Sequence, residues 1–255
     1  MRIQFCYSAF SNFGGYFRKK YGLTRLKRNV NDPAVFFGVY GSQIDRVFLH
    51  KALAVVIWAG SDALAFKKDA ERVKRLKEMD NVRVIAISDY IAKDMEEVGI
   101  ESITIPILPM ENKDISPCPL GDSMYIYRPN SPKYGRDITQ EVRRRLPHIN
   151  VVEGSPHKFN REELLEVYRN CFIALRPISH DGCSNTVAEM GLMGRPSVWN
   201  GGAPHALPWE TVDDVEQHVL NVYNNRDQYN WELTAQQAYD YYNVGNDFMY
   251  TEFYE

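Results

Sequence analysis

The chain has 255 residues, of which 44% are hydrophobic and 25% charged, with a formal net charge of −3. This composition is typical of a soluble globular protein long enough for two modest cores. No apolar run approaches the roughly 20 residues of a membrane span, and we expect no signal peptide. The 4 cysteines show no CxxC spacing, so we expect free thiols, no zinc site and a cytoplasmic location.

Charge is divided unevenly along the chain. Residues 1–110 carry 17 Lys and Arg against 12 Asp and Glu, whereas residues 111–255 carry 13 against 21. Much of the basic excess lies in residues 17–28 and 67–77. The first part of the chain is therefore basic and the second part acidic.

Apolar strand-like runs and helical patterns alternate through the first part. We expect strands at 2–7, 34–40, 53–59, 82–87 and 103–108, and helices from about 16, at 42–50, 67–79 and 88–98. A glycine turn at 11–15 would join the first strand to the first helix. Such alternation is typical of a parallel sheet with helices on both faces.

The alternation restarts after a proline-rich segment. We expect strands at 123–127, 150–153, 171–175 and 197–200, and helices at 137–146, 160–170, 184–193 and 210–221. The predicted organisation is a first domain at 1–110, a linker at 111–120, a second domain at 121–228 and a terminal helix and tail at 229–255.

The stretch from Arg176 to Pro196 carries the clearest candidate site. It follows the strand at 171–175, and residues 184–186 offer N-caps for a helix. Free backbone N–H groups and the helix dipole make such a helix start a phosphate site. Asp181 in the loop and Glu189 about one turn into the helix flank it. Because a carboxylate accepts hydrogen bonds from sugar hydroxyls, this pattern favours a nucleotide sugar over a bare phosphate.

The pattern resembles the paired-acid signature of family-4 retaining glycosyltransferases, which have the GT-B fold. The resemblance rests on Asp181-Gly182, the seven residues that separate Asp181 from Glu189, and the small residues up to Pro196. The family usually has Glu at the first position, so Asp181 is a departure, one methylene shorter. The structural alternative is a loop Asp that closes a turn and a helix Glu that faces solvent.

A second match follows the first strand of the second domain. Arg128 and Lys133 lie five positions apart, as do an Arg and a Lys that hold the donor diphosphate in the resembled family. Two cations would neutralise a leaving diphosphate whose charge grows as the glycosidic bond breaks, so they stabilise the transition state more than the ground state. A solvated basic turn is the alternative.

The resemblance also implies roles in other loops. Gly14 and Gly15 would lie near donor and acceptor, and Ser155 near the nucleotide base; a tight turn and a polar loop are the alternatives. Where relatives often carry a His near the reacting carbon, Asp62 is the nearest ionisable residue, and an Asp that caps the next helix is the alternative. The implied donor site comprises Gly14, Gly15, Arg128, Lys133, Ser155, Asp181, Gly182, Cys183, Ser184, Asn185, Thr186 and Glu189, and the implied catalytic residues are Asp181, Arg128, Lys133 and Asp62.

The resemblance implies an α/β protein of the GT-B fold, with two Rossmann-like domains whose parallel sheets face a central cleft and a last helix that returns to the first domain. The implied activity is retaining, metal-independent transfer of a hexose from a UDP- or GDP-linked donor to a hydroxyl, without a cofactor. In the implied front-face displacement, the departing phosphate helps take the acceptor proton. A nucleotide-sugar epimerase and a non-catalytic sugar-nucleotide or glycan binder are the alternatives, the latter suggested by the missing His and by Asp181.

The basic residues of the first domain suggest an anionic acceptor. Lys19 and Lys20 belong to a segment in which six of twelve residues are Lys or Arg. Nucleic acid or a phospholipid-linked glycan would suit them, and the latter would place the protein peripherally at a membrane surface. Solvated helix faces explain the same charges. Neither the sugar, the base nor the number of subunits follows from these residues.

Overall fold

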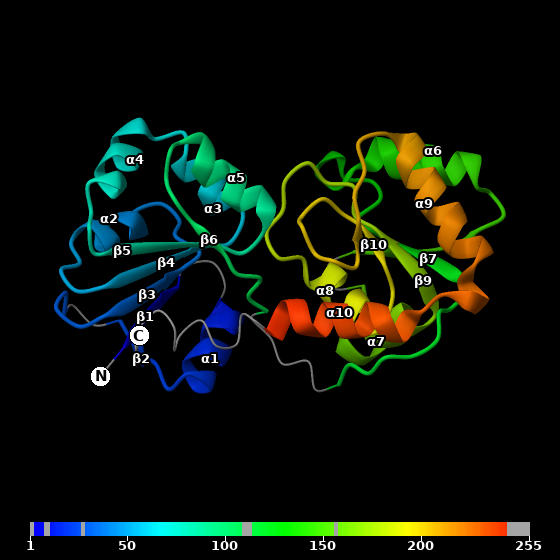
Figure 1. Ribbon diagram of the computed structural model, residues 1–255, viewed down its shortest axis with the longest axis horizontal. Helices are drawn as coiled ribbons and strands as arrows, with labels where there is room; N and C mark the ends of the chain where they lie inside the picture. Colours follow the sequence, from blue (N-terminus) through cyan, green and yellow to red (C-terminus); the bar gives the residue numbers. More distant parts are fainter. Residues whose placement is uncertain (1–2, 8–10, 27–28, 109–113, 156–157, 244–255) are drawn as a thin grey trace. The chain divides into compact units, whose positions relative to one another are not determined.

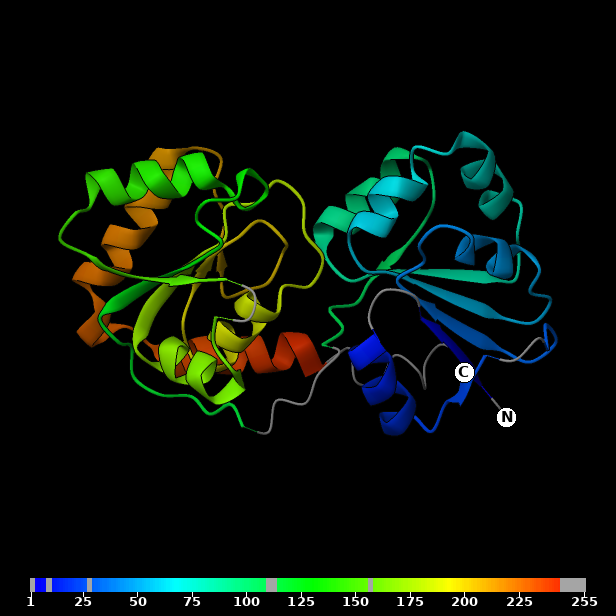
Figure 2. The same ribbon diagram turned by 180° about the vertical axis from the view of Figure 1, so that it is seen from behind.

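The computed structural model describes residues 3–7, 11–26, 29–108, 114–155 and 158–243. Their contacts divide the chain into two units. The first unit contains the described residues up to 108, the short segment His180–Cys183 and Asn243, and the second contains the described residues of 114–179 and 184–242. In each unit, helices cover both faces of one sheet (Figure 1, Figure 2).

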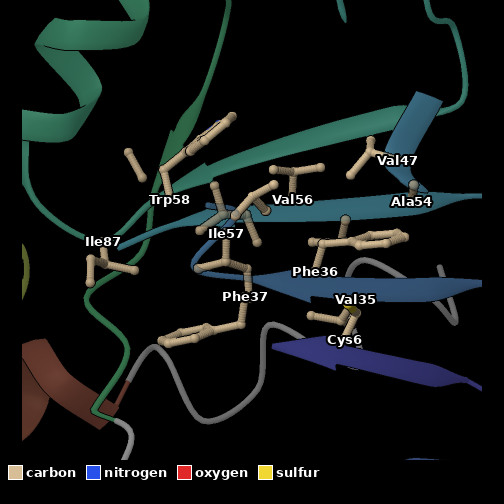
Figure 3. Packing of buried hydrophobic residues seen from close by; sticks show 14 of the residues in the cluster. Cys6, Val35, Phe36, Phe37, Val47, Ala54, Val56, Ile57, Trp58 and Ile87 are labelled. Atoms are coloured by element: carbon tan, nitrogen blue, oxygen red, sulfur yellow. The ribbon is translucent and has the colours of Figure 1, made fainter. Parts of the chain in front are cut away.

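The sheet of the first unit is parallel wherever its described strands pair. Its strand order is β2-β1-β3-β4-β5-β6. The strands are β1 (Gln4–Tyr7), β2 (Thr24–Arg25), β3 (Ala34–Phe37), β4 (Ala54–Trp58), β5 (Val82–Ala86) and β6 (Ile103–Thr104). Every side chain of β3 and β4 is buried, as expected for strands covered on both faces. Figure 3 shows Phe36 and Phe37 of β3 beside Val56 and Ile57, their partners in β4, in this core.

The helices of the first unit differ from the prediction at two places. They are α1 (Ser11–Lys20), α2 (Gln43–Phe48), α3 (Ser61–Phe66), α4 (Ala70–Lys77) and α5 (Asp89–Glu97), and α1 covers the face opposite the others (Figure 1). The predicted glycine turn at 11–15 is wrong, because Gly14 and Gly15 lie inside α1. Two interior glycines cost roughly 0.5–1 kcal/mol each relative to alanine, so the fold overrides local propensity there. The predicted helix at 67–79 starts later, because Asp69 caps α4 by accepting a hydrogen bond from the Arg72 N–H.

The second unit has a smaller parallel sheet in its described part, with the order β11-β10-β9-β7-β8. Its strands are β7 (Ser123–Tyr127), β8 (Asn150–Gly154), β9 (Cys171–Leu175), β10 (Ser197–Val198) and β11 (Ala206–Leu207). Its helices are α6 (Arg136–Arg145), α7 (Arg161–Arg169), α8 (Asn185–Leu192), α9 (Val212–Asn224) and α10 (Trp231–Asn243), with short 3-10 turns η1 (Pro132–Tyr134) and η2 (Arg226–Gln228). The described part of the predicted terminal helix, α10, belongs to this unit up to Tyr242, and residues 244–255 lie outside the described part.

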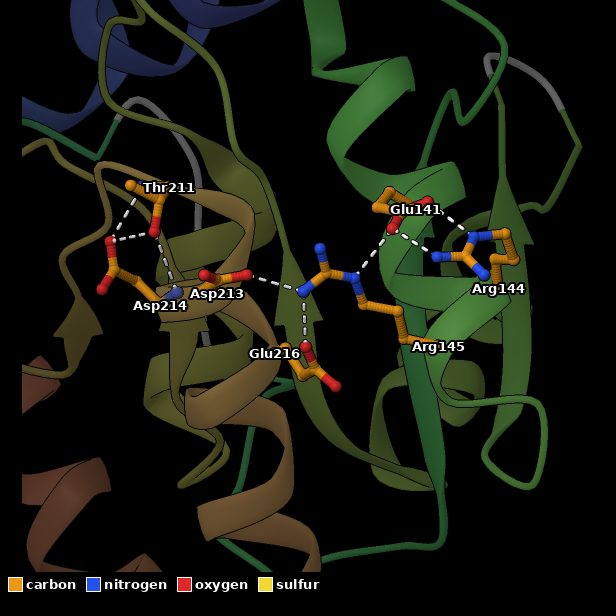
Figure 4. A network of polar contacts seen from close by, with 7 residues as sticks. All are labelled: Glu141, Arg144, Arg145, Thr211, Asp213, Asp214 and Glu216. Atoms are coloured by element: carbon orange, nitrogen blue, oxygen red, sulfur yellow. Dashed lines mark hydrogen bonds and ion pairs between the residues drawn. The ribbon is translucent and has the colours of Figure 1, made fainter.

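Ion pairs join α6 to α9 on one face of this sheet (Figure 4). The Arg145 guanidinium donates to Asp213 at 2.6 Å and to Glu216 at 2.7 Å in α9, and to Glu141 at 2.8 Å in its own helix. Thr211 and Asp214 cap the start of α9 in a reciprocal pair of hydrogen bonds. Because the ion pairs are partly exposed, they orient the helices more than they stabilise the fold.

One arginine holds several backbone segments of the second unit together. Arg195, whose exposed fraction is 0%, follows α8. Its guanidinium donates to the carbonyl oxygens of Tyr168 (3.0 Å), Cys171 (3.2 Å), Cys118 (2.9 Å), Pro119 (2.7 Å), Arg169 (2.7 Å) and Met193. The end of α7, the start of β9 and residues 118–119 of the predicted linker thus meet at one buried cation.

Candidate functional site

Three cationic side chains gather at the carboxyl ends of two neighbouring strands. Arg128 follows β7 and Arg176 follows β9, and these strands are parallel neighbours in the sheet. Lys133 comes from the turn η1, shortly after β7. Because β7 and β9 are neighbours, Arg176 lies near Arg128 and Lys133, the two residues that are predicted from the sequence to bind a diphosphate.

All three cations share the ring of Tyr134. Its centroid lies 5.4 Å from Cζ of Arg128, 5.2 Å from Cζ of Arg176 and 5.9 Å from Nζ of Lys133. The Tyr127 ring meets the Tyr134 ring edge-on at 5.1 Å and lies 5.6 and 5.7 Å from the Arg128 and Arg176 guanidinium groups. Each cation–ring contact is worth about 0.5–1 kcal/mol at an exposed site. The two rings thus hold together like charges that repel one another. We call these five residues the cation cluster.

The backbone of the cation cluster is held in an unusual conformation. Arg128 has a φ of +49°, in the left-handed region that costs a non-glycine residue about 1–2 kcal/mol. Its N–H donates to the Gly154 carbonyl at 2.8 Å, and its own carbonyl accepts from the Ser131 N–H at 3.0 Å. A side chain at Gly135 would overlap the carbonyl of Pro177, so the η1 turn packs closely on the residue after Arg176. Strain supported in this way is common at binding sites.

Glu189 is buried, with an exposed fraction of 2%, and does not face solvent. It pairs with the Arg161 guanidinium, which also donates to Asp114 at 3.1 Å. Burial raises the pKa of Glu189, whereas Arg161 lowers it. The hydrogen bond from Arg161 also holds the pKa of Asp114 below its usual value. Glu189 is therefore a buried carboxyl group with the Arg161 guanidinium as its ion-pair partner.

Two tyrosines lie close to this carboxyl group. The Tyr125 and Tyr168 rings meet edge-on at 5.0 Å, and the Tyr168 hydroxyl donates to Thr186 Oγ1 at 3.2 Å. Burial raises the pKa of Tyr125 to about 12, and the charge of Glu189 acts in the same direction. A side chain at Gly154 would overlap the Tyr125 hydroxyl. Ser155, the predicted base-site residue, is exposed and follows directly after this close approach.

The helix start predicted at residues 184–186 is confirmed. Ser184 is the N-cap of α8, and its hydroxyl accepts a hydrogen bond from the Val187 N–H at 3.4 Å. Asn185 and Thr186 form the first turn of α8. The start of α8 thus lies in the second unit, together with Glu189 and the cation cluster, and phosphate binding at this helix start stays a prediction.

The loop that carries Asp181 packs within the first unit. The Asp181 carbonyl accepts from the Ser88 hydroxyl at 3.0 Å, and the Asp181 carboxylate accepts from the Gly182 N–H at 3.0 Å. A side chain at Gly182 would overlap the Ala59 carbonyl, so only glycine fits there. Burial raises the pKa of the Cys183 thiol to about 12, which leaves Cys183 a neutral member of the predicted donor site.

Comparison with solved structures finds glycosyltransferases along nearly the whole chain. S. aureus TarM in complex with Fondaparinux, alpha-GlcNAc-glycerol and UDP aligns over 95% of this chain and 58% of its own, with a TM-score of 0.63 and 10% identity. Sucrose-phosphate synthase from Thermosynechococcus elongatus aligns over 93% of this chain and 74% of its own, with a TM-score of 0.62 and 11% identity. The UDP-forming alpha,alpha-trehalose-phosphate synthase from Burkholderia vietnamiensis aligns over 95% of this chain and 84% of its own, with a TM-score of 0.56 and 12% identity. The fold is GT-B.

At these identities the shared feature is the GT-B fold, and the chain spans less than two thirds of the TarM chain. No protein-family model and no curated protein matches the sequence. The predicted α/β class is confirmed, with one Rossmann-like sheet in each unit. Within the described residues, no helix is both long enough and apolar enough to cross a membrane.

Asp62 lies in the first turn of α3, shortly after β4, where its side chain joins backbone segments. Its exposed fraction is 1%. One carboxylate oxygen accepts from the Val39 N–H at 3.0 Å, and the other accepts from the Ala59 N–H at 3.1 Å. These contacts join the ends of β3 and β4 to the first turn of α3, whose N-cap is Gly60 and not Asp62. Asp62 thus holds backbone segments together, and its role at the reacting carbon stays a prediction.

We predict that Asp62 makes the protein less stable as the pH rises from about 4 to about 6. Burial raises the pKa of Asp62 from 3.8 to about 6 in the folded protein. In that range the unfolded chain ionises while the folded carboxyl group stays protonated, so the free energy of unfolding falls by at most about 3 kcal/mol. Urea denaturation across this range measures the slope. Asp62→Asn removes it, and an equal slope in wild type and variant contradicts the assignment.

Several basic residues of the first GT-B unit make contacts within the protein. Lys67 pairs with Asp94 and Glu97, and Arg72 pairs with Asp45 at 3.4 Å. Lys20 lies over the rings of Tyr16 and Tyr21 at 5.7 and 5.2 Å, and Lys19 is exposed beside it in α1. Lys67 and Arg72, which are paired with carboxylates, therefore attract an anionic acceptor less strongly than unpaired cations would.

Sequence reasoning missed several residues of the candidate site, among them Arg161, Arg176 and Tyr134. Arg161 has no signal of its own, because its partners Glu189 and Asp114 are distant in sequence. Arg176 opens the stretch singled out above, and a prediction of the strand order would have placed it beside Arg128. Tyr134 lies next to Lys133 and reads as an ordinary turn residue until the rings and cations are placed in space.

Proposed function

We propose that this protein is a glycosyltransferase that moves a hexose from a nucleoside diphosphate sugar, UDP- or GDP-linked, to an acceptor hydroxyl with retention of configuration. The observation that carries the proposal is the cation cluster at the ends of β7 and β9. It lies in the same unit as a helix start capped by Ser184 and a buried carboxylate at Glu189. The TarM structure named above contains UDP, which supports a uridine diphosphate donor.

Each part of the site has a chemical task in this proposal. Arg128 and Lys133 bind the diphosphate and stabilise the charge that it gains when the glycosidic bond breaks. Glu189 accepts hydrogen bonds from the ribose, and Asp181 positions the hexose. In a front-face displacement the departing phosphate oxygen takes the acceptor proton, so no protein nucleophile is required. The protein cations take the place of a metal ion, and the acceptor is a hydroxyl of a sugar, lipid or protein.

The deciding experiment follows labelled UDP-hexose and GDP-hexose with the full chain. Release of nucleoside diphosphate with transfer of label to an added acceptor supports the proposal. An isomeric nucleotide sugar formed without acceptor identifies an epimerase, and tight binding without turnover identifies a non-catalytic binder. The absence of binding to either nucleoside diphosphate contradicts all three functions.

We predict that the two acids have separable effects on ligand binding. Glu189→Gln is expected to weaken UDP binding about tenfold, because it loses a charge-assisted hydrogen bond worth roughly 1.5–3 kcal/mol. Asp181→Asn is expected to leave UDP affinity unchanged and to lower turnover. Calorimetry with UDP alone decides between them.

Two controls accompany this pair of variants. Thermal denaturation without ligand measures how far Glu189→Gln weakens the contact with Arg161. Glu166→Gln, on the exposed surface of α7 and paired with Arg169, controls for the loss of a carboxylate from the same unit. Equal losses of UDP affinity in Glu189→Gln and Asp181→Asn would show that the division of roles is wrong.

A further inference from the structure

The cation cluster contains one more positive charge than the predicted diphosphate site requires. Arg128 and Lys133 match the pair expected from the sequence, whereas Arg176 enters from the neighbouring strand β9. Its guanidinium lies 5.2 Å from the Tyr134 centroid and 5.7 Å from the Tyr127 centroid, on the same two rings as Arg128. The two arginines therefore share one aromatic platform.

The position of Arg176 is set by its backbone. Its N–H donates to the Val198 carbonyl of β10 at 3.1 Å, and its carbonyl accepts from the Ile178 N–H at 2.8 Å. The next residue, Pro177, lies against Gly135 at the end of the η1 turn. The loop after β9 and the turn after β7 are thus packed together, which places Arg176 and Lys133 on the same Tyr134 ring.

Charge matching indicates what such a cluster binds. A nucleoside diphosphate sugar carries two negative charges on its diphosphate, and the departing nucleoside diphosphate carries close to three at neutral pH. A site with three cations complements the departing diphosphate better than the intact donor. Interactions that strengthen as the bond breaks raise the rate of the chemical step, whereas interactions equal in both states only raise affinity.

We propose that Arg176 is a third cation of the diphosphate site, which binds the departing nucleoside diphosphate together with Arg128 and Lys133. This inference rests on the proposed function. When the bond between the anomeric carbon and the diphosphate oxygen breaks, the electron pair stays on that oxygen, and Arg176 stabilises the additional charge. The planar guanidinium presents two parallel N–H groups to phosphate oxygens, and the rings of Tyr127 and Tyr134 orient it. The site therefore prefers a diphosphate to a monophosphate.

The test measures binding of UDP, UMP and pyrophosphate to wild type and to Arg176→Gln. Loss of a charge-assisted contact to phosphate is expected to weaken UDP and pyrophosphate binding about tenfold or more. UMP binding is expected to change less than threefold. With a UDP-hexose that turns over, kcat is expected to fall more than KM rises. Arg176→Lys keeps the charge but loses the planar fork, so an intermediate loss of UDP affinity is expected.

Arg136→Gln is the matched control, because Arg136 lies beside the same turn but pairs with Asp137 at 3.0 Å. Wild-type UDP affinity is expected in this variant. If Arg176→Gln does not fold, as judged by thermal denaturation, Arg176→Lys and the salt dependence of its UDP binding carry the test.

The outcomes separate this inference from the proposed function. Wild-type affinity for UDP and pyrophosphate in Arg176→Gln, with a loss in Arg128→Ala, overturns the role of Arg176 and leaves the donor site intact. Binding of pyrophosphate that depends on Arg176, without turnover of any nucleotide sugar, supports the third cation and overturns the transferase. Equal losses for UMP and UDP show that Arg176 acts on the nucleotide as a whole and contradict the preference for a diphosphate.

Discussion

Replacing Arg128 or Lys133 with alanine is expected to lower kcat/KM for the nucleotide-sugar donor by about ten- to a hundredfold. Each side chain supplies a charge-assisted contact worth roughly 1.5–3 kcal/mol, which is realised most fully as the diphosphate departs. Arg143→Ala is the control, because Arg143 pairs with Glu153 on the exposed surface of α6. Wild-type kinetics in both site variants would contradict the assignment of the donor site.

A glycine at residue 128 separates the role of the side chain from that of the backbone. Because Arg128 has a φ of +49°, Arg128→Gly relieves a steric cost of about 1–2 kcal/mol that a left-handed non-glycine residue bears. We therefore expect activity as low as in Arg128→Ala, with a melting temperature at least as high as that of wild type. A large drop in melting temperature would instead assign Arg128 to the stability of the fold.

The second large effect is expected at Arg195, where the change is in stability. Arg195→Met leaves buried carbonyls without their donor, and such losses cost about 1–3 kcal/mol for each unsatisfied group. The Arg195 guanidinium donates to the carbonyl oxygens of six residues. We therefore expect the free energy of unfolding to fall by about 4 kcal/mol even after the structure relaxes, which is a large part of a typical stability of about 5–15 kcal/mol. Urea denaturation of the full chain measures it.

Arg195→Lys sharpens this test. A lysine ammonium has three donors and no planar fork, so it satisfies at most half of the six carbonyls. We expect it to lose more than half of the stability that Arg195→Met loses, although the charge is kept. Arg169→Lys, on the exposed surface of α7, is the matched control and is expected to change stability by less than about 0.5 kcal/mol. Wild-type stability in Arg195→Lys would show that charge rather than geometry matters.

Sequence patterns predict those strands and helix starts whose positions depend on neighbouring residues in the chain. The apolar runs at 123–127 and 171–175 match β7 and β9 residue for residue, because buried parallel strands are apolar on both faces. The start of α8 was predicted because Ser184 is a strong N-cap. By contrast, α1 begins before the glycines that suggested a turn, since packing outweighs a propensity of less than 1 kcal/mol per residue.

The candidate site was predictable only in part, for a physical reason. The roles of Arg128, Lys133 and Glu189 are predicted from a spacing that resembles that of family-4 retaining glycosyltransferases. The contacts of Arg176 and Arg161 depend on which strands are neighbours and which helices cover them, and spacing does not encode either. Whether a residue such as Asp62 serves the backbone or a ligand is likewise decided by the N–H groups that surround it.

The Arg195 contacts have a consequence for how this sequence can diverge. Six of its acceptors are main-chain carbonyl oxygens, and every amino acid supplies one. A substitution at Arg169 therefore leaves its contact in place as long as the backbone keeps its path, and no compensating change at Arg195 is required. Such an interaction produces no covariation between positions. A single residue can thus be intolerant of change while all of its partners drift freely, and an alignment of homologues would show an isolated invariant arginine with no sign of what it holds.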